Sequence, residues 1–268
     1  MIIGASSLAG SVYQLKHEVD SIELYIPKMG LYNGSKLQDD EFKKVYDELS
    51  TSNAFTSMHA PYFADVDTYP DDLLVDTTIM DDKQFGLMEE SIKLANKLDT
   101  RVVVIHPGKI HQDRYRSFSK MVDNLKSLAS TASDYGVMLG LENKEGTDTN
   151  NLCCDADELL QAVEEVNSDY LGVTFDIGHA NLTCGGDNQK LRYFANRISK
   201  YVVHMHLHDN YGLWTKDYDG DLHQAPGKCT IDFSILEDIK GYRGIYNLEV
   251  FSIDDVVAGK KIINNLRV

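Results

Sequence analysis

Hydrophobic and polar positions along the chain follow two alternating patterns. Short runs rich in β-branched residues, bounded by turn-forming residues, predict strands, and the longer segments between them repeat apolar residues every three or four positions, which predicts amphipathic helices. The helical spacing is plain in Phe85, Met88, Ile92 and Ala95. The predicted strands are Met1–Ala5, Ser21–Ile26, Ala54–His59, Arg101–His106, Val137–Asn143, Leu171–Asp176, Tyr201–His208 and Gly244–Val250.

Several of these runs, such as Val102–Ile105, are apolar throughout rather than alternating. This is typical of parallel strands that are covered on both faces. Eight such strands alternating with helices in 268 residues predict an α/β fold, a single (β/α)8 TIM barrel that spans residues 1–268 without a linker. A doubly wound open sheet is the alternative, but it would place a glycine-rich phosphate turn after the first strand, and Gly4–Ser7 is a poor match to one.

Composition narrows the class of protein. The 26 Lys and Arg residues against 42 Asp and Glu give a net charge of −16, which opposes non-specific attraction to a nucleic-acid backbone. No run of about 18 apolar residues predicts a membrane span, and the first residues lack the basic region of a signal peptide. The four cysteines form neither a disulfide framework nor a CxxC motif, so a cytoplasmic protein is expected. Nothing in the sequence indicates an oligomeric state.

Six consecutive predicted strands end in a histidine or a carboxylate. The carboxyl ends of barrel strands converge on one mouth, so these side chains are expected to meet there. One such histidine alone is more often structural, but a lone Glu249 in an apolar run is costly to bury without a partner. Paired carboxylates repel one another unless a cation lies between them, and imidazole with carboxylate suits Zn²⁺, Mn²⁺, Fe²⁺ or Co²⁺. The strand ends therefore predict a metal site built from His59, His106, Glu142, Asp176, His206 and Glu249.

Together these segments resemble the xylose isomerase-like TIM-barrel superfamily, which contains sugar isomerases and epimerases as well as endonuclease IV of the AP endonuclease family 2. With Glu249, the resemblance covers nearly the whole barrel and so implies the same fold. The segments that carry it are His59–Tyr62, His106–Gly108, Glu142–Asn143, Phe175–Ala180, His206–Asp209 and His223–Asp232.

The two branches of this superfamily imply different metal content. The sugar branch holds one divalent ion, zinc, manganese or cobalt, on residues that resemble Glu142, Asp176, His206 and Glu249. Endonuclease IV holds two or three zinc ions with further positions that resemble His59, His106, His179, Asp221 and His223. His204 and His208 share a strand face with His206. His206 fits the His-Leu-x-Asp pattern of the family, and His208 stays open as the alternative ligand.

The sugar branch also implies roles for individual side chains. Glu142 and Glu249 are the expected catalytic bases, one removing a proton next to the carbonyl and the other returning it, while the metal stabilises the enediolate. His179 is expected to contact a substrate oxygen. Lys144, with Lys109 and Lys228, is a candidate for binding a substrate phosphate. Tyr62 resembles a tyrosine with which endonuclease IV contacts DNA, although it can equally line a substrate pocket.

Three departures from endonuclease IV favour the sugar branch. The chain has Asp176-Ile177-Gly178-His179 in place of Asp-Thr-Cys-His, and the loop Met29–Ser35 lacks the arginine that probes DNA. The third is an acidic segment after the third strand, with Asp65, Asp67, Asp71, Asp72, Asp76, Asp81 and Asp82. The sequence thus predicts a metal-dependent isomerase or epimerase of a small sugar or sugar phosphate. A zinc phosphodiesterase that cleaves DNA at abasic sites is the alternative, and the substrate and the metal stay open.

Overall fold

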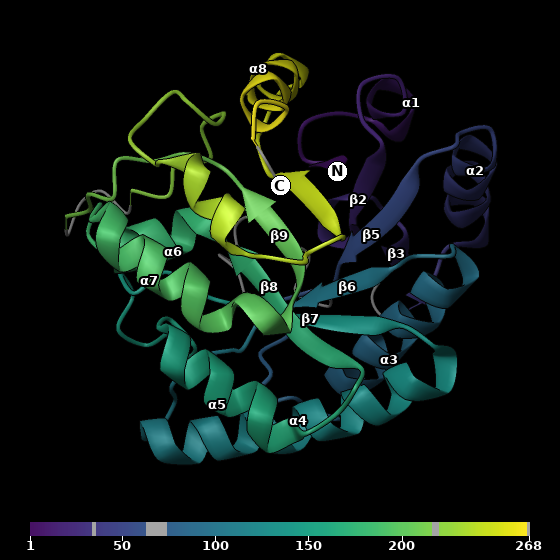
Figure 1. The fold of residues 1–268 in the computed structure, drawn as a ribbon. Coiled ribbons are helices and arrows are strands. Elements are labelled where there is room, and N and C mark those ends of the chain that lie inside the picture. Colours follow the sequence, from purple (N-terminus) through teal and green to yellow (C-terminus); the bar gives the residue numbers. More distant parts are fainter. Residues whose placement is uncertain (34–35, 63–73, 216–219, 267–268) are drawn as a thin grey trace.

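Eight parallel strands form the closed barrel that the sequence predicts. The computed structural model describes residues 1–33, 36–62, 74–215 and 220–266 (Figure 1). The barrel order is β1-β10-β9-β8-β7-β6-β5-β2, and each strand lies within two residues of its predicted position. The strands are β1 (Ile2–Ser6), β2 (Ser21–Tyr25), β5 (Phe55–His59), β6 (Val102–Ile105), β7 (Met138–Glu142), β8 (Leu171–Asp176), β9 (Val202–Leu207) and β10 (Ile245–Leu248).

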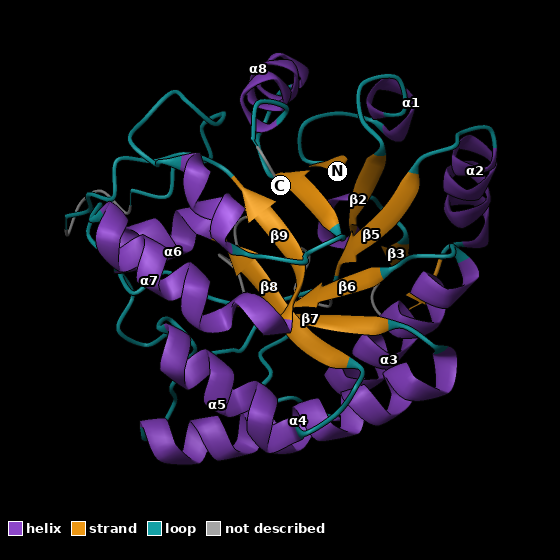
Figure 2. Cartoon of the chain, in the orientation of Figure 1, coloured by secondary structure: helices purple, strands orange, loops and turns teal. Residues whose placement is uncertain are grey.

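Helices surround the barrel and cover its outer face (Figure 2). They are α1 (Val12–Leu15), α2 (Asp39–Ser50), α3 (Asp82–Lys97), α4 (Arg114–Tyr135), α5 (Ala156–Val166), α6 (Ile177–Thr183), α7 (Asn188–Ile198) and α8 (Ile253–Ile263). Short 3-10 helices add η1 (Ile26–Lys28), η3 (Ser199–Tyr201) and η4 (Phe233–Asp238), and a small hairpin pairs β3 (Tyr32–Asn33) with β4 (Lys36–Leu37). The connection from β9 to β10 contains η4 where a regular barrel has an α-helix. Within the described residues, no helix is long and apolar enough to cross a membrane.

The buried apolar residues explain why the helices lie where they do. The predicted spacing in α4 turns Met121, Leu125 and Leu128 toward the strands, and each is fully buried. Strand residues such as Leu141 and Phe175 face them from the barrel wall. The core is therefore the layer between strands and helices, which leaves the inside of the barrel free for polar side chains.

The register of the strands sets the level of each inward-facing side chain. In the pairing of β8 with β9, Asp176 lies opposite His206, and in that of β7 with β8, Glu142 lies opposite Thr174. A register shift at Val173/Thr174 adjusts β8 against β9. Because successive side chains alternate between the two faces of a strand, these pairings put Glu142, Asp176 and His206 at neighbouring levels inside the barrel.

The described part of the acidic segment after β5 consists of one buried and two exposed aspartates. Asp81 accepts from the Gln84 backbone at 2.8 Å and begins α3 with a capping box, and both Asp81 and Asp82 are exposed. Asp76 is 2% exposed and binds the Lys109 backbone and His111 Nε2. A solvated loop would expose all of these carboxylates, so that description does not hold for Asp76, which is a buried structural residue. Asp65, Asp67, Asp71 and Asp72 lie outside the described residues.

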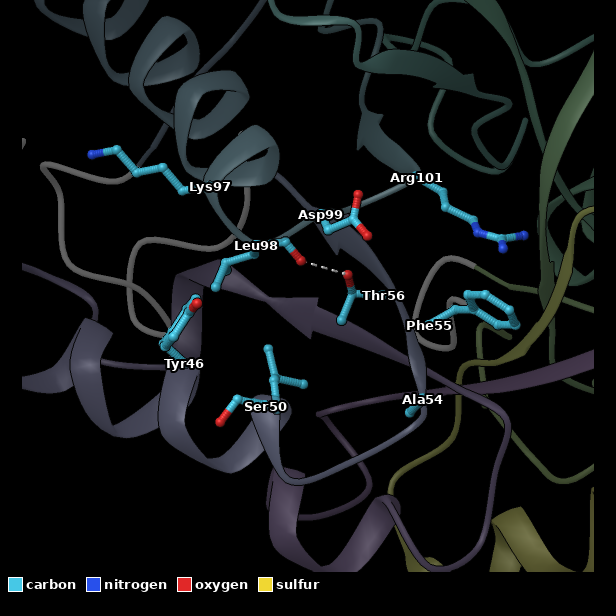
Figure 3. A pocket seen from close by; sticks show the side chains of 10 residues that line it. Tyr46, Ser50, Ala54, Phe55, Thr56, Lys97, Leu98, Asp99 and Arg101 are labelled. Carbon is cyan, nitrogen blue, oxygen red and sulfur yellow. Dashed lines mark hydrogen bonds between the residues drawn. The ribbon is translucent and has the colours of Figure 1, made fainter.

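A hollow of about 440 Å³ lies at the amino ends of β5 and β6, at the opposite end of the barrel from the strand carboxyl ends (Figure 3). The Arg101 guanidinium lies over the Phe55 ring, 3.6 Å from its centroid, and Thr56 Oγ1 donates to the Leu98 carbonyl at 3.3 Å. In TIM barrels this end serves stability, whereas active sites form at the carboxyl ends of the strands. The functional site is therefore expected at the carboxyl ends of the strands.

Candidate functional site

Four side chains from four strands converge at the carboxyl-terminal mouth of the barrel, and we call them the central tetrad: Glu142, Asp176, His206 and Glu249. His206 Nδ1 lies 3.3 Å from Glu249 Oε2, 3.7 Å from Glu142 Oε2 and 3.8 Å from Asp176 Oδ2. Each of the four residues is at most 5% exposed. Metal–ligand bonds of about 2.0–2.1 Å in a tetrahedral site separate the ligand atoms by roughly 3.3 Å. The spacing in the tetrad is close to that value.

Three of the tetrad atoms that face one another lack the hydrogen bonds that buried polar atoms usually form. Glu142 Oε2, Asp176 Oδ2 and His206 Nδ1 are buried and have no hydrogen-bond partner among the described residues. Buried polar atoms are nearly always satisfied, and unpaired buried carboxylates are especially costly. A divalent cation would satisfy all three atoms at once, so the donor set fits a metal ion of the Zn²⁺, Mn²⁺ or Co²⁺ type.

A second group lies against Glu142 on the side of β5 and β6. His106 Nε2 is 3.0 Å and His59 Nε2 is 3.5 Å from Glu142 Oε2. The Tyr62 ring lies over His106, with centroids 4.0 Å apart, and its hydroxyl is hydrogen-bonded to that of Tyr25. Tyr62 thus forms the wall of the site beside this group.

A third group lies on the side of β8 and the loop after β9. Asp221 Oδ2 is 3.2 Å from His223 Nε2 in the same loop and 3.4 Å from His179 Nε2 in α6. The loop after β9 therefore contacts the start of α6. His208 lies between this group and the tetrad, with Nε2 3.1 Å from Asp176 Oδ1 and 3.7 Å from Asp221 Oδ1. His206 alone of the two faces Glu142, which favours His206 as the tetrad histidine.

The histidines share a tautomeric arrangement that is typical of metal ligands. His59 Nδ1 donates to the Ala60 carbonyl at 2.9 Å, His179 Nδ1 to Asn143 at 3.0 Å, and His223 Nδ1 to Glu249 at 2.8 Å. In each ring the other nitrogen faces a carboxylate of the site, and it would bind a metal only without a hydrogen of its own. Metal-bound histidines commonly hold their second nitrogen in this way.

Hydrogen bonds hold in place the loop that brings Asp221 and His223 of the third group to the site. The buried Asp209 carboxylate accepts from the backbone N–H groups of Gly227, Cys229 and Ile231, at 3.0, 2.8 and 3.1 Å. Its backbone pairs in both directions with Gln224, at 2.7 and 3.1 Å. Asp209 therefore anchors the returning loop directly beside His223.

The sequence analysis missed Glu23 and Glu145. Glu23 in β2 is fully buried, and its Oε2 lies 2.9 Å from both His204 Nε2 and His206 Nε2. Glu145 Oε2 lies 3.3 Å from Lys144 Nζ and 3.7 Å from His179 Nε2. The signal for Glu23 was present, because a lone carboxylate in the apolar run Ser21–Tyr25 is the feature that singled out Glu249.

These contacts determine the pKa values of the side chains at the site, and therefore their charges. Burial alone would raise the pKa of Glu142, but His106 and His206 outweigh it and hold that pKa well below its usual range. Burial likewise opposes the effect of His179 and His208 on Asp176, whose pKa is lowered to about 2. Burial, with the Lys144 ammonium, lowers the pKa of His106 to about 3. Glu142 and Asp176 are thus ionised and His106 is neutral near pH 7. Burial would lower the pKa of His206, but Glu23 and Glu249 outweigh it and raise that pKa well above its usual value, so His206 must lose a proton before it binds a metal.

The family model for the xylose isomerase-like TIM barrel matches residues 15–266, and the chain belongs to this family. The uncharacterized protein MJ1311 of Methanocaldococcus jannaschii is 37% identical over 183 residues, which are 66% of this chain and 59% of MJ1311. The chain therefore spans less than two thirds of this relative's length.

Two solved structures have the same fold. A D-tagatose 3-epimerase-like protein superimposes with a TM-score of 0.80 and 28% identity, over 98% of this chain and 96% of the other. The IolI protein, solved with a bound zinc atom, has a TM-score of 0.73 and 19% identity over 98% of this chain and 96% of its own. The resemblance and the fold expected from the sequence are thus confirmed.

Replacing Asp176 with Ala should empty the tetrad of metal, because it removes one of three carboxylates from the proposed ligand set. The fold should survive, since the side chain lies at the mouth and not in the apolar layer. Asp176 also begins α6 by accepting from the His179 backbone at 2.8 Å. The matched control is Asp187→Ala, which removes the corresponding cap of α7 but none of the four tetrad side chains. Elemental analysis of both dialysed variants decides the point, and full metal occupancy in Asp176→Ala contradicts the assignment.

The metal-free protein should lose stability as the pH rises from about 6.5 to 9. Burial lowers the pKa of His223, but Asp221 overrides it and raises that pKa from 6.5 to about 9. A pKa that is raised on folding stabilises the protein below the unfolded value, and this contribution is lost as the pH passes the folded value. Thermal unfolding in EDTA at pH 6, 7.5 and 9 measures the effect. His223→Gln should flatten part of the decline, and a wild-type stability that rises over this range contradicts the prediction.

Proposed function

We propose that this member of the xylose isomerase-like family is a divalent-metal-dependent isomerase or epimerase of a small sugar. The central tetrad carries the proposal, because its three unpartnered buried atoms and Glu249 face one another at the spacing of metal ligands. The 28% identity to a D-tagatose 3-epimerase-like protein over almost the whole chain supports the same class of reaction. Zinc, manganese and cobalt all suit the donors.

The two glutamates of the tetrad supply the proton chemistry in this proposal. Glu142 ends β7 and Glu249 follows β10, so their carboxylates enter the mouth from separate parts of the barrel wall. One of them would take the proton from the carbon next to the carbonyl, and the other would return it to the opposite face. The ion, when bound, would polarise the substrate's carbonyl and hydroxyl oxygens and favour loss of that proton. His179, 3.1 Å from Glu142 Oε1, would contact a substrate oxygen.

The lysines at the mouth favour a sugar without a phosphate. Lys109 Nζ is 2.8 Å from Asp148, and Lys228 is paired with Asp255. Lys144 is buried beside Glu145; burial would lower the Lys144 pKa, but Glu145 and Glu142 raise it well above its usual value. Each lysine is therefore engaged with a carboxylate. Lys144 is better suited to hold a neutral hydroxyl oxygen than to bind a phosphate.

The test is exchange of a substrate proton with solvent. The zinc-, manganese- or cobalt-loaded protein should incorporate deuterium from D₂O next to the carbonyl of a small ketose, detected by NMR, because the proposed step makes an enediolate. Glu142→Gln and Glu249→Gln should each lower the rate by a factor of 100 or more, as expected when a general base is lost. Glu165→Gln, an exposed glutamate of α5, is the matched control and should leave the rate unchanged.

Cleavage of DNA at an abasic site is the result that would oppose the sugar proposal. A duplex with one abasic site, incubated at physiological salt with the same preparations, should be cut weakly or not at all, since the −16 charge disfavours phosphate contacts. Efficient incision that is abolished by Glu142→Gln, together with no deuterium incorporation into any ketose tested, contradicts the sugar proposal. That result would not contradict the proposed metal site.

One observation favours the endonuclease IV-like phosphodiesterase as a second candidate. All nine residues that the resemblance assigns to a three-zinc centre meet at the mouth. They form one group with His59, His106 and Glu142, a second in the tetrad, and a third with His179, Asp221 and His223. Several ions on adjacent groups could stabilise both oxygens of a displacement at phosphorus.

Metal content separates the two candidates. Under the sugar proposal we expect one tightly held ion per chain, and His106→Ala should keep it while slowing turnover, because His106 lies outside the tetrad. Metal counting by mass spectrometry of the native protein measures this directly. Three ions in the wild type, with loss of one in His106→Ala, would support the phosphodiesterase instead.

A further inference from the structure

We propose that Glu23 is a positioning residue of the metal site, which fixes the ring orientation and tautomer of His206 so that Nδ1 faces the tetrad. This inference rests on the metal site of the proposed function and holds whichever substrate that site takes. Glu23 lies outside the ligand set that the sequence predicts, and it comes from the second strand of the barrel, where the sequence analysis placed no functional residue.

The geometry joins distant parts of the chain inside the barrel. Glu23 in β2 and His206 in β9 are 183 positions apart in sequence, and β1 and β10 lie between their strands in the barrel. The Glu23 side chain therefore crosses the interior, where it is fully buried, to bring Oε2 within 2.9 Å of His206 Nε2. His204, two residues earlier on the same face of β9, places its own Nε2 2.9 Å from the same oxygen.

These two contacts determine which nitrogen of His206 can bind a metal. A neutral imidazole has one N–H, and a carboxylate oxygen can only accept, so Nε2 of His206 carries the hydrogen. Nδ1 is then left with its lone pair, and it is buried without a hydrogen-bond partner 3.3 Å from Glu249 Oε2. The opposite tautomer would turn a lone pair toward the Glu23 carboxylate and a hydrogen toward the ion. Glu23 excludes that arrangement.

The position of the Glu23 carboxylate is itself fixed. Glu23 is fully buried, and the oxygen that faces His206 also lies within hydrogen-bond distance of His204 Nε2. Glu23 is therefore held in place by one histidine while it orients the other. A carboxylate behind a metal-bound histidine fixes the ring and increases its basicity.

The first measurement is metal affinity. Glu23→Gln keeps the size of the side chain but removes its charge, and loss of such a partner typically weakens metal binding about ten- to a hundredfold. Zinc affinity, measured by competition with a chromophoric chelator, should fall by that factor. Ser57→Ala is the matched control, because Ser57 lies opposite Glu23 in the β2–β5 register, is fully buried, and forms no hydrogen bond through its hydroxyl within the described residues. The control should keep wild-type affinity.

The second measurement reports the tautomer itself, first in the wild type and then in Glu23→Gln. In ¹⁵N-histidine NMR spectra of the zinc-loaded protein, His206 should carry its hydrogen on Nε2, with Nδ1 shifted by the metal. In Glu23→Gln the Nε2–H signal should move or broaden, because the anionic acceptor is gone. A role of Glu23 in folding alone would lower the unfolding temperature of the variant without changing this signal.

The outcomes separate this inference from the proposed function. If the wild type binds zinc but His206 is protonated on Nδ1, or if Glu23→Gln binds zinc as tightly as the wild type, Glu23 is not a positioning residue. The sugar proposal would survive that result. If the wild type binds no divalent metal at all, both fail together. Should Glu23→Gln not fold, Glu23→Asp keeps the charge on a shorter side chain and is expected to show an intermediate affinity.

Discussion

The crowding of four carboxylates, three of them buried, at one end of the barrel is the constraint on which the rest of the site depends. Glu142, Asp176 and Glu249 face one another, and Asp221 lies just beyond them with Oδ1 3.7 Å from His208 Nε2. Like charges held this close in a buried site are tolerated only if cations compensate them. Without a metal ion, protonated histidines compensate the charge of the carboxylates. When a metal ion binds in their place, those histidines must lose their protons. The mouth is thus a site in which protons and a metal compete for the same carboxylates.

That constraint explains why the surrounding structure fixes histidine nitrogens so thoroughly. A ring that was free to rotate or change tautomer could satisfy the carboxylates with a proton and lose the ion. Backbone carbonyls hold His59, His179 and His223, and they do so through strand ends and loops whose positions the barrel sets. The tetrad histidine has no such carbonyl, because it lies within a strand whose backbone groups are engaged in the sheet. Glu23 supplies the missing acceptor from across the interior.

Most of the barrel, and the side chains that converge at its mouth, could be predicted from the sequence, but the contacts that orient those side chains could not. The end of a strand can be recognised from local strand and turn patterns, and these patterns identify His59, Glu142 and Asp176 as residues at strand ends. Glu23 acts on a residue 183 positions away, and only the closure of the barrel brings the two together. Lys144 shows the same limit. Its position in a loop suggested phosphate binding, whereas in the folded chain its ammonium group forms an ion pair with the Glu145 carboxylate.

The two candidate functions draw on the same mouth of the barrel, one on the tetrad and the other on all nine residues, so the choice between them depends on what lies between the groups. A side chain at Gly178 would place its Cβ 2.1 Å from His208 Cε1, and Gly178 occupies the place of the cysteine in the endonuclease IV pattern. His208 can therefore occupy the space between Asp176 and Asp221 only because that cysteine is absent. An imidazole there keeps the Asp176 and Asp221 carboxylates apart. This separation favours one ion acting on a small substrate over adjacent ions that share a phosphate.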